Sequence, residues 1–190
     1  RNNDVTAQFS VKTQAGQLSI AKRDVTLTSA TDSKQYDGKA LTNSEVTVSG
    51  DGFVGEEGAT YSVTGSQTIV GSSENYFTYG LKPGTKAENY NIKTQNGTLT
   101  VTNRDAKYEI TVVANSGGEK YDGSEQSVSG LVTDTFTVNG ETFKVEGLTA
   151  EAKATDAGTY PVNVTGTPVV KDARNNDVTA QFSVKTQAGQ

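Results

Sequence analysis

The 190-residue chain contains no cysteine, histidine, methionine or tryptophan, and only three prolines. Without histidine or cysteine it has no Ser-His-Asp triad, no thiol nucleophile and no zinc site built from these ligands. Without cysteine it also has no disulfide to stabilise a small domain. Only carboxylate, lysine, tyrosine and hydroxyl chemistry remains. We therefore expect a protein that is not an enzyme and that has no catalytic residue, cofactor or metal.

Large apolar side chains and basic charge are also scarce. Leu, Ile, Val and Phe together number 38 of the 190 residues, and the net charge is −5. No apolar run approaches the roughly 20 residues of a membrane span. A negative balance disfavours nucleic acid and anionic membranes as partners, because both require a basic face. The sequence shows no signal peptide, and we expect any export or anchoring signal to lie outside it.

Threonine and valine, residues that favour strands, are abundant at 28 and 21. Apolar and polar residues alternate with a period of two in short runs, which is typical of half-buried strands. Asn139-Gly140 lies between two such runs and predicts a two-residue type I′ hairpin. Pro161 predicts an edge position, because it has no amide hydrogen. The expected strands are 25–28, 46–48, 61–64, 76–79, 99–102, 108–112, 135–138, 141–145, 160–164 and 182–184, with at most one helical turn per module.

Two levels of repetition organise the chain. Residues 1–17 recur letter for letter as residues 174–190, which indicates a tandem array with a period of 173 residues. Within that period, residues 12–20 resemble residues 93–101, and each block is followed by a Tyr-Asp-Gly tripeptide. We predict module A over residues 24–103 and module B over residues 104–190. Residues 1–23 are then the closing strands of a preceding module B.

These features predict an all-β, mainly β, fold: two tandem small β-sandwich-like (Ig-like) modules in an elongated rod. The alternative is a pair of β-grasp-like α+β modules, each with one short helix. A domain of about 80–90 residues buries only about 60–65% of its unfolded surface, so we expect neighbouring modules to stabilise each other through their interfaces. The run 18–27 is expected to pass from one module's last strand straight into the next module's first strand.

Several short motifs, taken in order, resemble the YDG and MBG-type repeats of large bacterial surface proteins. The motifs are Tyr36-Asp37-Gly38, Val46–Phe53, Val63–Gln67, Gly97–Val101 and Asp156–Tyr160. The resemblance implies an extracellular, cell-wall-attached location on a bacterium, within an adhesin-like protein. It carries over no catalytic residues. It also implies neighbouring repeats as partners, with host mucin, glycan or protein bound through other domains.

The Tyr-Asp-Gly tripeptides, Tyr36-Asp37-Gly38 and Tyr121-Asp122-Gly123, are the clearest candidate sites. One interpretation is an aromatic lip that binds sugars. The interpretation we favour is a tight turn in which Asp caps its own backbone, Gly takes a positive φ and Tyr covers the core. Recurrence in both modules favours this structural role.

Other candidate sites are weaker. Two sets of oxygen-bearing side chains suit calcium, but neither has the spacing of an EF-hand loop. Lys12 and Lys93 are candidates for an isopeptide cross-link to an Asn beside a buried acid. The sequons that begin at Asn96 and Asn163 lie where hairpin or strand structure already explains them. The calcium candidates are Asp51, Glu56 and Glu57 in one loop, and Asp172, Asn175, Asn176 and Asp177 before a strand.

Two functions remain open. In the first, the modules are spacers of a stalk that holds a distal binding domain away from the cell. In the second, each module grips mucin or another glycan weakly and the array gains avidity from many copies. The second hypothesis rests on the aromatic residues Tyr76, Phe77, Tyr79 and Tyr90.

The repeat boundaries also predict association between chains. The second copy of the 17-residue sequence reaches Gln190, and the counterpart of residues 18–21 does not follow it. Module B would thus lack its final strand, whereas residues 1–23 carry a spare copy of it. We expect this segment of one chain to complete module B of another, giving head-to-tail association by strand addition.

Overall fold

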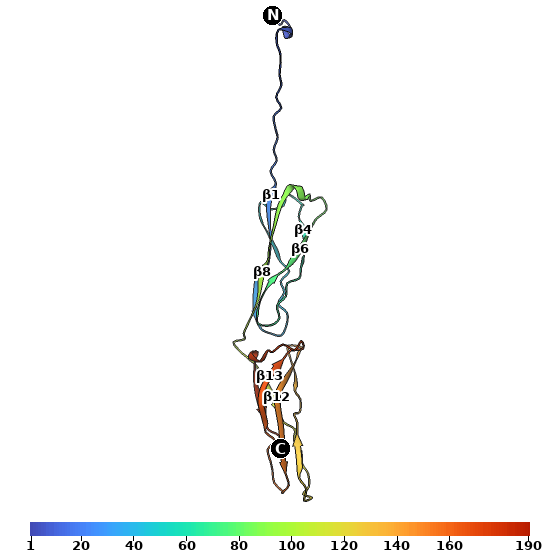
Figure 1. Ribbon diagram of the computed structural model, residues 1–190, viewed down its shortest axis with the longest axis vertical. Helices are drawn as coiled ribbons and strands as arrows, with labels where there is room; N and C mark the ends of the chain where they lie inside the picture. Colours follow the sequence, from blue (N-terminus) through green and yellow to red (C-terminus); the bar gives the residue numbers. More distant parts are fainter.

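The computed structural model describes residues 1–190, and its long axis carries two β regions one above the other (Figure 1). The N-terminal segment, residues 1–22, extends from the first region along the same axis. The fold is mainly β, as predicted, and it contains no α-helix of the kind that the α+β alternative requires. Its only helices are 3₁₀ turns of three residues, η1 (Thr6–Gln8), η2 (Ala87–Asn89) and η3 (Thr179–Gln181). No helix is long and apolar enough to cross a membrane.

The first region contains eight strands in three small sheets. The strand orders are β3-β1-β7, β2-β8-β5 and β4-β6. The strands are β1 (Arg23–Ser29), β2 (Asp32–Gln35), β3 (Val46–Gly50), β4 (Ala59–Val63), β5 (Gly71–Asn75), β6 (Phe77–Leu81), β7 (Tyr90–Gln95) and β8 (Gly97–Thr102).

A parallel pairing of the first and last strands runs the length of this region. Arg23 lies opposite Tyr90 where β1 pairs with β7, and Asp32 lies opposite Leu99 where β2 pairs with β8. Both pairs are 67 residues apart, so the register does not shift between the two sheets. The paired segments span 13 residues, or about 40 Å at about 3.3 Å per residue. Because they run in the same direction, the chain enters the region at one end and leaves it at the other.

The second region repeats this parallel pairing with six strands. β9 pairs with β14 from Tyr108 opposite Phe182 to Val113 opposite Gln187. The other strands form the order β10-β12-β11, with β13 paired to β12. No sheet includes strands of both regions. The strands are β9 (Tyr108–Val113), β10 (Gln126–Ser129), β11 (Thr135–Val138), β12 (Glu141–Ala154), β13 (Val164–Lys171) and β14 (Phe182–Gln187).

Most of the predicted strands are present, and the hairpin is confirmed. Val138 lies opposite Glu141, and the intervening Asn139 and Gly140 have φ of 53° and 79°, as a type I′ turn requires. One expectation was wrong: the strand predicted over residues 160–164 begins only at Val164. Before it, Val162 pairs only with Gly189 in an isolated bridge, because no strand lies beside residues 160–161. In the run 18–27, residues 23–27 lie in β1, and residues 18–22, expected to belong to the last strand of a preceding module, form no strand here.

Three hydrophobic clusters lie along the long axis. One in the first region centres on Val25, Leu27 and Tyr90, and one in the second on Ala114, Ala150 and Val162. The largest contains 11 buried residues and includes side chains of both regions. The core is therefore continuous across the point where the two regions meet.

Candidate functional site

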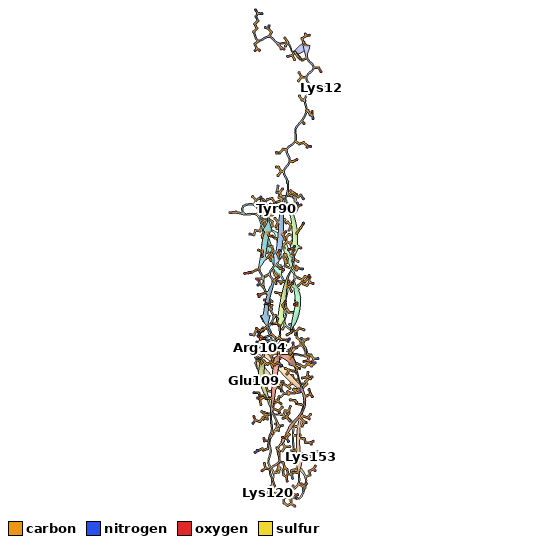
Figure 2. All side chains as sticks on the ribbon, turned by 90° about the vertical axis from the view of Figure 1, so that its left-hand side faces the viewer. Lys12, Tyr90, Arg104, Glu109, Lys120 and Lys153 are labelled. Carbon is orange, nitrogen blue, oxygen red and sulfur yellow. The ribbon has the colours of Figure 1, made fainter.

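The junction between the two β regions is the most extensively built site in the molecule. Four of its buried residues come from the first region and seven from the second. Figure 2 shows Arg104 at this junction, in the short connection between β8 and β9. The members are Tyr36, Leu41, Leu99 and Val101 from the first region, and Ile110, Val112, Phe143, Val145, Val170, Val178 and Phe182 from the second.

Polar contacts hold the connection against both regions. Arg104 donates from Nη1 to the backbone oxygen of Tyr36 at 3.0 Å, and its guanidinium lies 3.9 Å from the ring centre of Tyr108. The buried Gln181 accepts from the backbone N–H of Arg104 at 2.8 Å and donates to Asn103 at 2.7 Å. Buried polar groups paired in this way resist bending, because any hinge motion would leave them without partners.

The first Tyr-Asp-Gly turn docks directly onto the second region. Asp37 accepts from the backbone N–H of Lys39 at 2.9 Å, and Gly38 has a φ of 81°, as the turn interpretation requires. A Cβ on Gly38 would lie 3.1 Å from the ring of Phe143. Asn139 donates to the backbone oxygen of Asp37 at 3.2 Å. The turn is therefore part of the contact between the two regions.

Burial sets the chemistry of this turn. Tyr36 is 1% exposed, and its hydroxyl has no hydrogen-bond partner. Burial, together with the nearby charges of Asp172 and Asp37, raises the pKa of Tyr36 to about 12. For Asp37, burial acts to raise the pKa, but the hydrogen bonds from Lys34 and Lys39 outweigh it and leave that pKa lowered. Tyr36 is neutral at physiological pH and serves as core.

The second Tyr-Asp-Gly turn has the same local geometry without the burial. Asp122 accepts from the backbone N–H of Ser124 at 2.9 Å, and Gly123 has a φ of 82°. Tyr121, however, is 64% exposed, against 1% for Tyr36. The expectation that the Tyr covers the core is therefore confirmed in the first turn and wrong in the second, because Tyr121 lines an open groove and belongs to no buried cluster.

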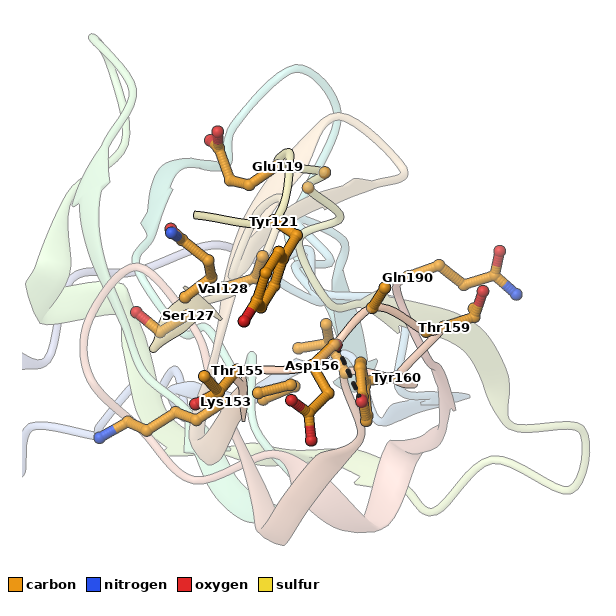
Figure 3. Close-up of a pocket in the computed structure, with 18 of the residues that line it drawn as sticks. Glu119, Tyr121, Ser127, Val128, Lys153, Thr155, Asp156, Thr159, Tyr160 and Gln190 are labelled. Carbon is orange, nitrogen blue, oxygen red and sulfur yellow. Dashed lines mark hydrogen bonds between the residues drawn. The ribbon is translucent and has the colours of Figure 1, made fainter. Parts of the chain in front are cut away.

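A groove lies beside Tyr121 in the second region (Figure 3). It has a volume of about 420 Å³, and residues 117–121 and 152–160 form much of its lining. Tyr121 and Tyr160 lie on opposite sides of it in Figure 3. The hydroxyl of Tyr160 donates to the backbone oxygen of Asp156 at 3.0 Å. Its lining combines apolar with polar residues.

The first calcium candidate, Asp51, Glu56 and Glu57, is engaged in structural contacts. Asp51 accepts from the backbone N–H of Asp24 at 2.9 Å. Glu57 accepts from the hydroxyl of Tyr90, and this hydrogen bond raises the pKa of that tyrosine. Glu56 is exposed and makes no such contact. The structure does not bring the three carboxylates together around one point.

The second candidate, Asp172, Asn175, Asn176 and Asp177, is a self-capped loop. Asp172 accepts from the backbone N–H groups of Arg174 and Asn176 at 2.9 and 2.8 Å. Asn175 takes a φ of 66°, which allows the turn. Asp177 accepts from Thr179, whose hydroxyl and backbone N–H lower the pKa of that carboxyl. These side chains hold the backbone, and no cluster of three or more acidic ligands is present.

The aromatic residues proposed to bind glycans do not form one surface. Tyr90 is 4% exposed and packs against Phe53 with ring centres 5.1 Å apart. Phe77 packs edge-on to Tyr61 at 6.4 Å within the same core. Only Tyr76 and Tyr79 are exposed. Two of the four side chains are therefore part of the core and not available to a ligand.

Lys12 and Lys93 are both exposed, which does not match the buried surroundings that an isopeptide cross-link requires. Lys12 lies on the N-terminal segment, away from both β regions (Figure 2). Asn96, between β7 and β8, and Asn163, just before β13, are also exposed.

The residues that matter most at the junction were not singled out from the sequence. Arg104, Phe143 and Gln181 make its central contacts. The sequence around each of them does not differ from that of ordinary turn and strand residues. One signal was available. Gln181 belongs to the exactly repeated 17-residue sequence, and Arg104 follows the diverged block 93–101 by three residues, as Arg23 follows the block 12–20.

Comparison of the chain with family models, with curated proteins and with solved structures finds no match.

Proposed function

We propose that this chain is a structural repeat of a bacterial cell-surface adhesin, a stalk or spacer that projects a distal binding domain away from the cell wall. In this proposal residues 24–103 and 104–190 are two small sandwich-like modules of a rod. The spacer needs no catalytic residue, cofactor or metal of its own. Its partners are the neighbouring repeats.

The observation that carries the proposal is the parallel pairing of first and last strands in each region. Arg23 and Tyr90 are paired at one end of the first region, and Gln35 and Thr102 at the other. A unit whose chain enters and leaves at opposite ends extends the array by its full length each time it is repeated. At about 40 Å per region, one 173-residue period would add about 80 Å.

The shared core at the junction supports stiffness. A spacer transmits its length only if consecutive units do not fold back on each other. Here Tyr36 and Phe143 belong to one buried cluster, and Gln181 and Arg104 pair across the connection. Separating the two regions would expose this cluster to water, which opposes bending at the junction.

Distance measurements between the regions test the stiffness. The chain has no cysteine, so Ser62→Cys and Thr167→Cys provide two unique labelling positions, one exposed on each region. We expect electron-spin distance measurements to give one narrow distribution. In a matched doubly labelled chain that also carries Arg104→Ala, the distance distribution should be broader, because the contact to Tyr36 is lost. A broad distribution in the unaltered junction would contradict the spacer proposal.

Display on a bacterial surface tests the role itself. Proteins with one, two and four 173-residue periods beneath a fluorescent tip domain should raise the tip in proportion to copy number. The increment should be about 80 Å per period. A tip height that does not change with copy number would exclude a spacer, whatever the array binds.

A further inference from the structure

The groove beside Tyr121 lies between two segments that have no strand partner on their facing edges. Residues 118–121 form one side and residues 157–160 the other. Neither segment makes a backbone–backbone hydrogen bond to another part of the chain. Extended backbone with unpaired N–H and C=O groups is a template for an added strand.

The first region shows what occupies the corresponding place there. There β8 lies between β2 and β5. It is parallel to β2 and antiparallel to β5. The β8 side chains Leu99 and Val101 are 0% and 1% exposed. The backbone N–H of Tyr36 donates to Thr102 at 2.9 Å. Tyr121, the counterpart of Tyr36, has no such bond.

The path of the backbone at the end of the groove matches in the two regions. A Cβ on Gly97 would lie 2.3 Å from the oxygen of Ala30, and one on Gly189 would lie 2.1 Å from the oxygen of Asn115. Gly97 pairs with Asn75, and Gly189 pairs with Val162. Gly189 therefore corresponds to Gly97, and the strand that begins there points along the groove.

The repeat identifies the residues that belong in the groove. Gly16-Gln17 is the first copy of Gly189-Gln190, and Leu18-Ser19-Ile20-Ala21 follows the first copy. Leu18 and Ile20 then take the places of Leu99 and Val101. In the structure they are 88% and 87% exposed on the N-terminal segment. Their spacing puts both on one face of a strand.

The floor of the groove suits these two side chains. Val128, Ala152 and Val162 line it. Val162 belongs to a cluster of only three buried residues, of which two are alanines, and Val128 and Ala152 pack against that cluster. In the first region, β8 contributes the buried side chains Leu99 and Val101 to the equivalent place. An apolar strand entering the groove would complete the smaller cluster.

We propose that residues 18–22 of a second copy of this chain bind in the groove as a middle strand. The strand lies parallel to residues 117–121, and its residues 18–20 lie antiparallel to residues 158–160. By correspondence with β8, Leu18 lies opposite Gly117 on one side and Tyr160 on the other. The proposal concerns assembly of the chain and does not depend on the spacer role.

Pro161 does not block this pairing. Val162 and Gly189 exchange two hydrogen bonds, at 2.8 and 3.0 Å. In an antiparallel pair such residues alternate with residues whose N–H groups point away. Pro161 therefore occupies a position that needs no donor toward the added strand, and Tyr160 presents its N–H and C=O to it.

The donor segment extends from one end of the molecule, whereas Lys120 and Lys153, which line the groove, lie near the other end (Figure 2). The N-terminal segment therefore does not reach the groove of the same chain, and a second chain bound to the first leaves its own groove free. Such a heterologous contact produces open, head-to-tail assemblies. The average mass should therefore rise continuously with concentration, without a single preferred oligomer.

Sedimentation velocity of the 190-residue chain tests this. The double variant Leu18→Asp, Ile20→Asp should weaken association by about tenfold or more, because it places charges in apolar sites. Val5→Asp, Val11→Asp is the matched control, since both valines are exposed on the same segment but outside residues 18–22. Neither variant alters a packed residue. A strictly monomeric parent chain, or equal losses from both variants, would overturn the proposal.

Peptide binding tests the groove directly. A labelled peptide of residues 18–24 should bind the Leu18→Asp, Ile20→Asp chain in fluorescence anisotropy, and a scrambled peptide should not. By analogy with Tyr36, the N–H groups of Glu119 and Tyr121 face the added strand, and that of Lys120 faces away. Glu119→Pro should therefore weaken peptide binding by about tenfold, consistent with the loss of a buried hydrogen bond. Lys120→Pro should not.

Loss of binding in both proline variants would assign the effect to a distorted loop and overturn the proposed register. A chain that does not bind the peptide but binds mucin oligosaccharides would assign the groove to sugars if Tyr121→Ala abolished that oligosaccharide binding. That result would overturn the proposal as well.

Discussion

The two copies of the 17-residue sequence have identical residues and different environments. Each forms the same 3₁₀ turn, with φ and ψ of −120° and 19° at Val5 and −120° and 21° at Val178. Yet Phe9 is 67% exposed, whereas its counterpart Phe182 is 4% exposed. Residues 182–187 form β14, and residues 9–14 form no strand. The turn is a local property of these residues, whereas the strand requires a partner.

The two Tyr-Asp-Gly turns give the same lesson. Gly38 and Gly123 have φ of 81° and 82°, and each Asp caps the backbone two residues on. Tyr36 is buried against the second region, and Tyr121 borders an open groove. Turn geometry follows from the tripeptide, but burial follows from what lies next to it.

The largest effect is expected from the aromatic ring of the packed copy. The ring centre of Phe182 lies 4.8 Å from that of Phe143 and 5.8 Å from that of Tyr108. Phe182→Ala should lower the free energy of unfolding by about 3–5 kcal/mol, as large-to-small core substitutions do. Phe9→Ala should leave it unchanged in the same urea titration. Equal losses would show that the first copy is packed as the second is.

A smaller difference is expected between the two turn glycines. Alanine at Gly38 or Gly123 must take a left-handed backbone, at a cost of about 1–2 kcal/mol in either case. Only at Gly38 would the new methyl also lie 3.1 Å from Phe143; at Gly123 its nearest neighbour is 3.9 Å away. Gly38→Ala should therefore be the more destabilising substitution in urea unfolding. Equal values would mean that the turn does not press on the second region.

The dependence of the free energy of unfolding on alkaline pH tests whether Tyr36 is a core residue. Its folded pKa of about 12 exceeds the ordinary value of 10.0, so its contribution to stability is complete below pH 10.0. That contribution is lost as the pH rises toward the folded pKa, because the unfolded chain ionises first. Tyr36→Phe should not lower stability at pH 7, since the hydroxyl has no partner, and should reduce the alkaline loss. An unchanged alkaline loss in Tyr36→Phe would contradict this assignment.

The smallest difference is expected between Asp4 and Asp177. Each accepts hydrogen bonds from the hydroxyl and the backbone N–H of the threonine two residues on, and these bonds lower both pKa values below 3.8. NMR titration should find similar values, since the cause lies within the turn. Lys171 lowers the pKa of Asp177 slightly further. An ordinary pKa at Asp4 alone would show that the turn itself depends on packing.

Strands with clear alternation and a strong turn could be predicted from the sequence. The hairpin around Asn139-Gly140 is the best case, because the dipeptide determines both the turn type and the register. β2 and β5 were not predicted. Their residues are largely polar, and both strands exist because β8 lies between them and bonds to each. The parallel pairing of first and last strands also left no local signal, since it joins residues 67 apart.

The amino-acid sequence alone determined the repeats, the β class, the two Tyr-Asp-Gly turns and the repeated 3₁₀ turn. These depend on short-range sterics and on side chains that bond to their own backbone. Only the tertiary structure decided that Tyr36 is core and Tyr121 is not, that the two regions share one cluster, and that a groove lies where β8 has no counterpart. Burial and strand pairing depend on distant segments, and identical residues differ when those segments are present in one place and absent in the other.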